Sequence, residues 1–236
     1  MFEERIYREL VEDSELVNAI VVEKESDLQI LSSAAFESED TLKEIRKIIS
    51  DYIAGHKRFQ ESLEPIEQDF KADPIVQHMI EASRDAEVGP MAAVAGTVSE
   101  YLGKEVRKYS DEVVIENGGD IYMDCGCDKR VLVYAGESVL SNKLSIKITQ
   151  EMMPVGICTS AGTVGHSLSF GKADAVVVIS KDTPLADATA TSLCNRVKSS
   201  DDISRAIEFG KNINGILGIL IIIGDKLGVW GEIELA

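Results

Sequence analysis

The sequence predicts an α+β fold in which antiparallel or mixed sheets pack against helices and the last part of the chain forms a β-hairpin. Segments with strand character and segments with helical periodicity come in clusters along the 236 residues, without strict β-α-β alternation. An apolar fraction of 44% and a charged fraction of 28% fit a globular chain with a sizeable core. Neither a repeat nor a change of composition marks a linker, so we expect a single domain over residues 1–236.

A β-hairpin and an amphipathic helix are the first elements that the sequence predicts. Residues 16–33 read as two short strands joined at Lys24–Asp27. In the segment that follows, apolar residues recur at helical spacing, and Thr41 with Glu44 is expected to form a capping box at the helix start. Gly55 is expected to end this helix, because glycine has a low helix propensity.

Two further helices are predicted before residue 110. One covers residues 75–86, and the other begins near Pro90, whose missing N–H costs nothing in the first turn of a helix. The residues after Pro90 have unusually small side chains: Ala92, Ala93, Ala95 and Gly96. Small residues favour tight packing or the close approach of a ligand, and the free N–H groups of a helix start suit an anion. The sequence leaves both interpretations open.

The second half of the chain is predicted to alternate strands and turns before two helices and a hairpin. The strands are expected at residues 112–117, 121–124, 131–135, 144–148 and 175–179. The helices are expected at residues 184–197 and 201–209. The apolar segment 216–235 reads as a hairpin with Gly224–Lys226 at its turn, and its surface is compatible with a homo-oligomer interface.

The composition argues against several classes of protein. A net charge of −17 argues against a nucleic-acid partner, because phosphate binding needs clustered lysine and arginine. The N-terminal residues mix charged and apolar side chains and do not resemble a signal peptide. The most apolar run, Ile216–Ile223, is too short to cross a bilayer, so we expect no membrane segment. These observations predict a cytoplasmic protein with reduced cysteines.

Two interpretations of the polar residues are disfavoured. Gly165–Ser169 resembles the nucleophile elbow of a serine hydrolase, but an elbow is followed by a helix, and here a loop and a strand are expected. The chain also has no histidine after His166 to complete a triad. A zinc site built from Cys125 and Cys127 with a further cysteine or His166 is disfavoured by spacing, because only one residue separates the first pair.

Asp187 and Thr191 form a better candidate site. They lie four residues apart in a predicted helix, so both side chains share one face. A carboxylate, a hydroxyl and a backbone carbonyl are the hard oxygen donors that Mg²⁺ prefers, although Asp187 could instead only favour the helix dipole. Gly118 and Gly119, which precede Asp120, leave a similar choice between a tight hairpin and a backbone that approaches a ligand closely.

Three segments, in this order, resemble motifs of the ApbE family, the FAD:protein FMN transferases. Residues 89–96 lie where that family has a glycine-rich helix start. Residues 117–121, Asn-Gly-Gly-Asp-Ile, are similar to its N-x-G-G-D-I signature. Residues 176–178 and then 186–191 are similar to its strand followed by A-D-A-L-A-T-A. The resemblance extends over residues 88–195, and the family's H-I-x-D-P-x-T-G segment is absent, so the chain looks most like the uncharacterised cytoplasmic branch of ApbE-related proteins.

The resemblance implies an ApbE-like fold with a cleft for FAD, FMN or another nucleotide. It implies Mg²⁺ bound by Asp187, Thr191 and the carbonyl of Ala190, with FMN or nucleotidyl transfer from FAD as the activity. A non-catalytic module that keeps the fold and binds a small ligand or a partner is the alternative. Asp187 and His166 would be the catalytic residues, with His166 lining the cleft beside residues 117–121. The nucleotide would contact two segments of the chain: Asn117, Gly118, Gly119, Asp120, Thr159, Ser160, Gly162 and Thr163.

Overall fold

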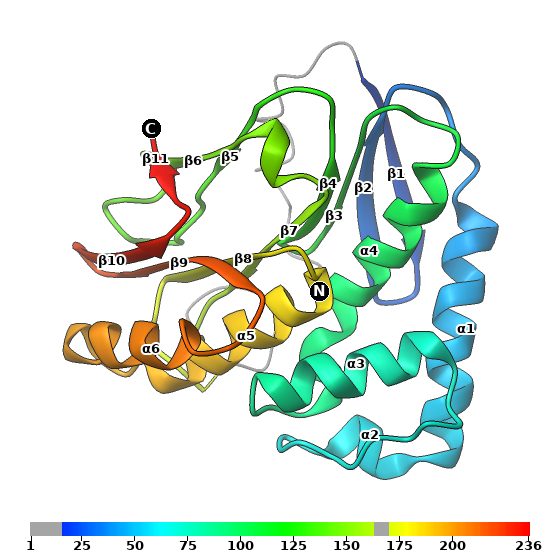
Figure 1. Ribbon diagram of the computed structural model, residues 1–236, viewed down its shortest axis with the longest axis horizontal. Coiled ribbons are helices and arrows are strands. Elements are labelled where there is room, and N and C mark those ends of the chain that lie inside the picture. The colour runs from blue at the N-terminus through cyan, green and yellow to red at the C-terminus, as the bar shows by residue number, and fades with distance from the viewer. Residues whose placement is uncertain (1–15, 163–169) are drawn as a thin grey trace.

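The computed structural model describes residues 16–162 and 170–236 (Figure 1). Thr163 and His166, two of the predicted site residues, lie outside this part of the chain. Among the described residues, eight strands form one antiparallel sheet in the order β1-β2-β3-β4-β7-β8-β9-β10. Their bounds are β1 Val17–Glu23, β2 Ser26–Ser32, β3 Val113–Asn117, β4 Asp120–Asp124, β7 Val155–Ser160, β8 Ala175–Ser180, β9 Ile216–Ile223 and β10 Lys226–Gly231.

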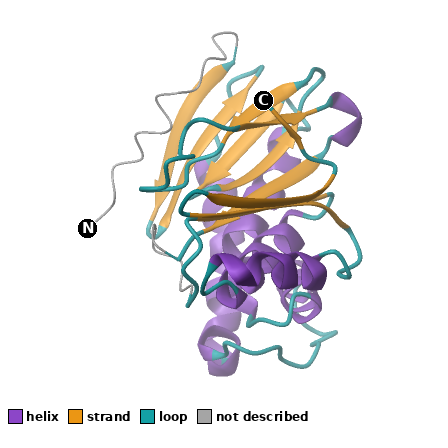
Figure 2. Ribbon diagram, turned by 90° about the vertical axis from the view of Figure 1, so that its left-hand side faces the viewer, coloured by secondary structure: helices purple, strands orange, loops and turns teal. Residues whose placement is uncertain are grey.

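The helices lie together on one face of this sheet, as Figures 1 and 2 show. Their bounds are α1 Glu39–Gly55, α2 Lys57–Glu61, α3 Pro74–Asp85, α4 Val94–Val106, α5 Thr183–Arg196 and α6 Ile203–Gly210. A 3₁₀ helix, η2 (Pro90–Ala93), leads into α4. The apolar side chains between this layer and the sheet form the larger of two hydrophobic cores.

The opposite face of the large sheet carries the second core, which is shared with a small sheet. The small sheet has the order β11-β6-β5, with β5 at Lys129–Leu132, β6 at Ser145–Ile148 and β11 at Glu234–Leu235. Strand β8 lies between both cores, and all of its residues are buried. Burial on both faces explains its continuous apolar run, Ala-Val-Val-Val-Ile.

Most of the elements expected from the sequence are present, and the α+β class is confirmed. The hairpin of residues 16–33 turns at Lys24 and Glu25, and α1 ends at Gly55 as predicted. The predicted capping box is wrong, because α1 begins at Glu39 and its N-cap residue is Ser38. The sequence analysis also missed β7, a short strand with glycine as its second residue.

Helix α5 occupies the centre of the helical layer. Its residues from Thr183 to Cys194 are all buried, and it packs against α3, α4, α6 and the sheet. Alanine and threonine dominate this stretch, so neighbouring backbones can approach it closely. The helix therefore places its polar side chains inside the protein, where a polar group without a hydrogen-bond partner destabilises the fold through its desolvation.

Candidate functional site

The β3–β4 hairpin brings Asn117 and Asp120 to the start of α4. Its two turn residues are Gly118 and Gly119, with φ of 69° and 102°. A two-residue turn with positive φ at both positions favours glycine, so the tight hairpin accounts for this pair. A Cβ at Gly119 would meet only ordinary contacts, at 3.7 Å or more from Thr159. Contact between these glycines and a nucleotide stays a prediction.

Asp120 faces the helical layer from the first position of β4. Its backbone carbonyl accepts a hydrogen bond from the Ser99 hydroxyl of α4 at 2.9 Å, and Asn117 donates to the Ala95 carbonyl at 3.3 Å. The residue is 6% exposed, and its Oδ1 has no hydrogen-bond partner among the described residues. Burial, followed by the negative charge of Asp187, raises the pKa of the Asp120 carboxyl well above its usual range.

Asp187 lies one turn inside α5, and its carboxylate meets the start of α4. The Gly96 N–H donates to Oδ2 at 2.8 Å. Burial raises the pKa of Asp187, while the hydrogen bonds from Gly96 and Ala95 act in the opposite direction. The anion-binding position at this helix start is therefore filled by a carboxylate of the chain itself. Asp187 does not cap its own helix, because that side chain is Asp182, which accepts from the Leu185 N–H.

Helices α4 and α5 place a carboxylate at each other's N-terminal end. Glu100 of α4 accepts from the Thr183 N–H at 2.7 Å, in the first turn of α5, and pairs with Lys104 at 2.5 Å. The close contact at the other end requires glycine at position 96. A Cβ there would lie 2.6 Å from the Thr183 carbonyl oxygen and 2.8 Å from the Asp187 Cβ. Gly96, one of the small residues after Pro90, thus serves helix-on-helix packing.

The residues predicted to hold Mg²⁺ share the buried part of α5. Thr191 lies one turn after Asp187, so both side chains project from one face of the helix. The Ala190 carbonyl lies within the hydrogen-bonded interior of α5, which leaves it one lone pair for a cation. Asp120, whose Oδ1 is unpartnered, adds a further oxygen near Asp187, since the charge of Asp187 raises the pKa of the Asp120 carboxyl. The donor set consists of hard oxygens and fits Mg²⁺.

The other predicted nucleotide contacts lie on and after β7. Ser160 is buried and its hydroxyl has no partner within the described part of the chain. Thr159 points to the opposite face of the sheet, because side chains alternate along a strand. Gly162 donates its N–H to the Ala173 carbonyl at 2.8 Å and packs so closely on Gly171 that a Cβ would lie 2.3 Å from its carbonyl oxygen. Whether these residues bind a nucleotide stays a prediction.

The sequence analysis did not predict a cluster formed by His78, Asp182 and Tyr101. The ring of His78, on α3, lies 2.8 Å from the Asp182 carboxylate and 3.4 Å from the Tyr101 hydroxyl. Burial disfavours the imidazolium, yet the hydrogen bond and charge of Asp182 raise the pKa of His78 overall. The pKa of Asp182 is lowered by the same pair, although its burial acts in the opposite direction. No local pattern could have found this contact, because 104 residues separate the partners.

The cysteines behave as ordinary thiols in this structure. Cys125 and Cys158 are buried, and burial raises the pKa of both. Cys127 is exposed. Residues 16–162 and 170–236 contain no group of three or more histidine, cysteine or acidic side chains placed to hold a metal ion. The disfavoured zinc interpretation therefore gains no support from the described residues.

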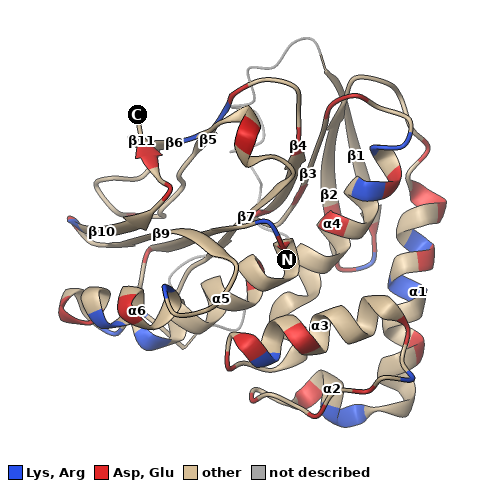
Figure 3. Cartoon of the chain, viewed as in Figure 1, with Lys and Arg blue, Asp and Glu red and all other residues tan. Residues whose placement is uncertain are grey.

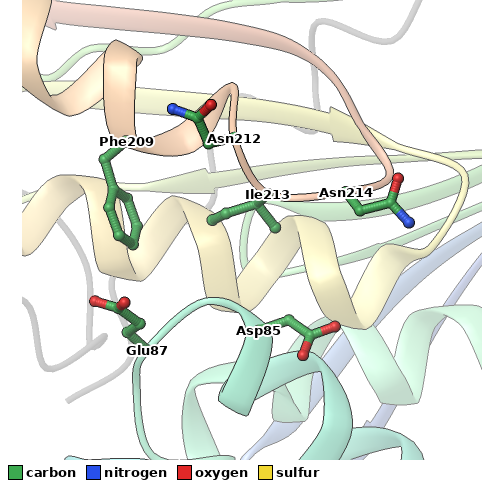
Figure 4. A pocket seen from close by; sticks show the side chains of 6 residues that line it. All are labelled: Asp85, Glu87, Phe209, Asn212, Ile213 and Asn214. Atoms are coloured by element: carbon green, nitrogen blue, oxygen red, sulfur yellow. The ribbon is translucent and has the colours of Figure 1, made fainter.

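A shallow groove lies between the end of α3 and the end of α6 (Figure 4). It has a volume of about 390 Å³ and is lined by Asp85, Glu87, Phe209, Asn212, Ile213 and Asn214. Beside it, the Arg196 guanidinium stacks 3.6 Å from the Phe209 ring centre and pairs with Glu87 at 2.7 Å. None of the predicted site residues lines this groove.

Charged side chains are distributed unevenly over the helices. Acidic and basic side chains are interspersed on α1, α2 and α3, whereas α5 carries few charges (Figure 3). Within residues 16–162 and 170–236, the structure contains no helix that combines the length and apolarity needed to span a bilayer.

Comparison with known proteins relates both the sequence and the fold to one family. The family model described as "AbpE bacteria" matches residues 8–230. A UPF0280 protein of Methanococcus maripaludis is 41% identical over 201 residues, covering 83% of this chain and 81% of that relative. A UPF0280 protein of Methanocaldococcus jannaschii is 37% identical over 201 residues, covering 83% of this chain and 82% of that relative.

Solved structures share the fold at low sequence identity. The apo form of flavinyl transferase ApbE from Pseudomonas stutzeri aligns with a TM-score of 0.57 and 11% identity, covering 92% of this chain and 94% of that one. Flavin transferase ApbE from Vibrio cholerae aligns with a TM-score of 0.57 and 13% identity, covering 92% and 96%. The resemblance and the fold that the three sequence motifs implied are confirmed, whereas at this identity the likeness carries no information on activity.

Proposed function

The chain belongs to the family described as AbpE bacteria, and from this premise we propose that it binds a flavin nucleotide or a related nucleotide together with Mg²⁺. The observation that carries the proposal is a pair of carboxylates, Asp120 of β4 and Asp187 of α5, that are 6% and 7% exposed. Neither forms an ion pair within the described part of the chain. Ionising both buried acids without a cation is costly, as their raised pKa values reflect, and a bound divalent cation would offset that cost.

The proposed reaction is transfer across the pyrophosphate of FAD. An acceptor oxygen would form a bond to the FMN phosphorus, the P–O bond to the AMP moiety would break, and AMP would leave. Bound Mg²⁺ would supply positive charge to the phosphate oxygens as negative charge develops on them. Asp187 and Thr191 would hold the cation with the Ala190 carbonyl. The role predicted for His166 is polar positioning or proton transfer, and in this reaction the proton transferred would be that of the acceptor.

Several contacts keep the proposed ligands in position without the nucleotide. The Gly96 N–H orients one oxygen of Asp187, and the Ser99 hydroxyl ties the first residue of β4 to α4. The start of α4 thus joins the two carboxylate-bearing elements. Such prior positioning lowers the cost of assembling a cation site on binding.

The test measures FAD affinity by titration, with and without Mg²⁺, in the parent protein and in Asp187→Asn. The variant keeps a side-chain oxygen for the Gly96 N–H and removes the charge that attracts a divalent ion. We expect the parent to bind FAD more tightly with Mg²⁺ and the variant to lose that dependence. Thermal stability should not fall, because the substitution also removes a buried charge. Asp124→Asn, at the other end of β4 and paired with Arg107, is the matched control.

Equal magnesium dependence in the parent and in Asp187→Asn would withdraw the metal site. Flavin binding without release of AMP, with every acceptor tried, would support the non-catalytic binding module instead. Retained flavin is detectable from the absorbance of the purified protein.

A further inference from the structure

The carboxylate of Asp120 is only partly compensated: it accepts hydrogen bonds from the Cys158 thiol and the Thr159 N–H, and it has no ion pair among the described residues. Oδ1 of Asp120 is buried and has no hydrogen-bond partner among the described residues. Buried Glu100 pairs with Lys104 and accepts from the Thr183 N–H, and buried Glu116 accepts from the Gly119 N–H at 2.8 Å. An unpaired buried carboxylate oxygen therefore requires an explanation of its own.

The backbone of Asp120 is anchored, so the unpartnered Oδ1 is not a consequence of a loose strand end. Asp120 pairs with Asn117 across the hairpin and with Cys158 of β7. Its carbonyl accepts from Ser99 of α4, three residues after the Gly96 that donates to Asp187. Two acidic residues, one on β4 and one on α5, are thus held at the same end of α4.

From this geometry we propose that Asp120 is a second carboxylate ligand of the divalent cation at Asp187, so that β4 and α5 bind the bare metal between them. The inference rests on the proposed function and adds to it a residue from a different element. Two carboxylates, one hydroxyl and one carbonyl make an oxygen site that leaves room for water or phosphate oxygens, as Mg²⁺ requires. Removal of one carboxylate lowers the negative charge and the ligand number together.

The experiment titrates the metal-free protein with Mn²⁺ alone, without nucleotide, and follows free Mn²⁺ by electron paramagnetic resonance. Mn²⁺ serves as the probe because it accepts the same oxygen ligands as Mg²⁺. The proteins compared are the parent, Asp120→Asn, Asp187→Asn and the control Asp124→Asn. We expect one site in the parent, an affinity at least about tenfold weaker in D120N and in D187N, and an unchanged affinity in D124N.

Each other outcome has a distinct meaning. Loss of affinity in D187N alone would overturn the role of Asp120 and leave the metal at Asp187 in place. The parent protein could instead bind no bare Mn²⁺ while D120N is more heat-stable than the parent. That result would show that the two acids share a proton, and it would overturn this inference. The nucleotide titration of D187N would still decide the proposed function. If D120N does not unfold in a single cooperative transition, Asp120→Ser replaces it, since serine is smaller and also uncharged.

Discussion

Replacing Gly96 with alanine tests the contact that brings α4 and α5 together. The added Cβ would lie 2.6 Å from the Thr183 carbonyl oxygen and 2.8 Å from the Asp187 Cβ, so the two helices must move apart. Overpacking of this kind costs about 1–3 kcal/mol. Alanine returns up to about 1 kcal/mol through its better helix propensity. We therefore expect the free energy of unfolding to fall by about 1–2 kcal/mol, or about 2–8 °C in Tm.

The assay is thermal unfolding of metal-free protein followed by circular dichroism, with Gly55→Ala as the matched control. Gly55 is the last residue of α1, and a Cβ there would meet nothing within 4 Å. This control should be neutral or slightly stabilising, because only helix propensity changes. G96A with a Tm equal to or above that of G55A would refute the argument that the α4–α5 contact requires glycine. Because a shift of α4 also moves the N–H that orients Asp187, G96A should weaken Mn²⁺ binding as well.

Two further predictions concern His78 and the cysteines. The pKa of His78 is raised on folding, so this residue contributes stability below its unfolded pKa of about 6.5, and that stability is lost as pH rises through the folded pKa. The pKa of Asp182 is lowered on folding, so its contribution is lost as pH falls below about 4. The two side chains are 22% and 39% exposed, which limits the contribution of the pair to the free energy of unfolding to about 1 kcal/mol. The urea midpoints at pH 6 and pH 8 should therefore differ less in His78→Gln than in the parent. Equal differences in the two proteins would contradict this assignment. Replacement of Cys125 and Cys127 by serine should leave metal content, measured by mass spectrometry, unchanged, whereas stoichiometric zinc lost in the double variant would restore the zinc interpretation.

Local patterns in the sequence were sufficient for most of the elements. The apolar spacing of α1 predicted a helix whose buried face is Leu42, Ile45 and Ile49. The turn residues Gly118 and Gly119 predicted a tight hairpin, because positive φ at both positions favours glycine. These features depend on residues within one or two turns of each other, so the sequence alone contains them.

The sequence did not reveal which elements meet, and the candidate site depends on this. Periodicity tells which face of a helix or strand is buried but does not identify the surface that covers it. Asp187 lies 91 residues from the Gly96 N–H that orients it, and Thr183 lies 83 residues from Glu100. In the sequence, Asp187 resembles a helix-start acid, whereas in the structure that role belongs to Asp182. Similarly, the small residues near Pro90 suited an anion, and the anion is a carboxylate of α5.

The sequence by itself therefore determined the class of fold, the positions of most helices and strands, and the oxygen-rich residues from which a cation site could be built. Only the tertiary structure decided that Asp120 and Asp187 lie together, buried and without a cationic partner in the described part of the chain. The physical reason is that desolvation and the charge of a neighbouring acid depend on distances in space. Those distances are set by the packing of β4, α4 and α5, and no local pattern in the chain encodes them.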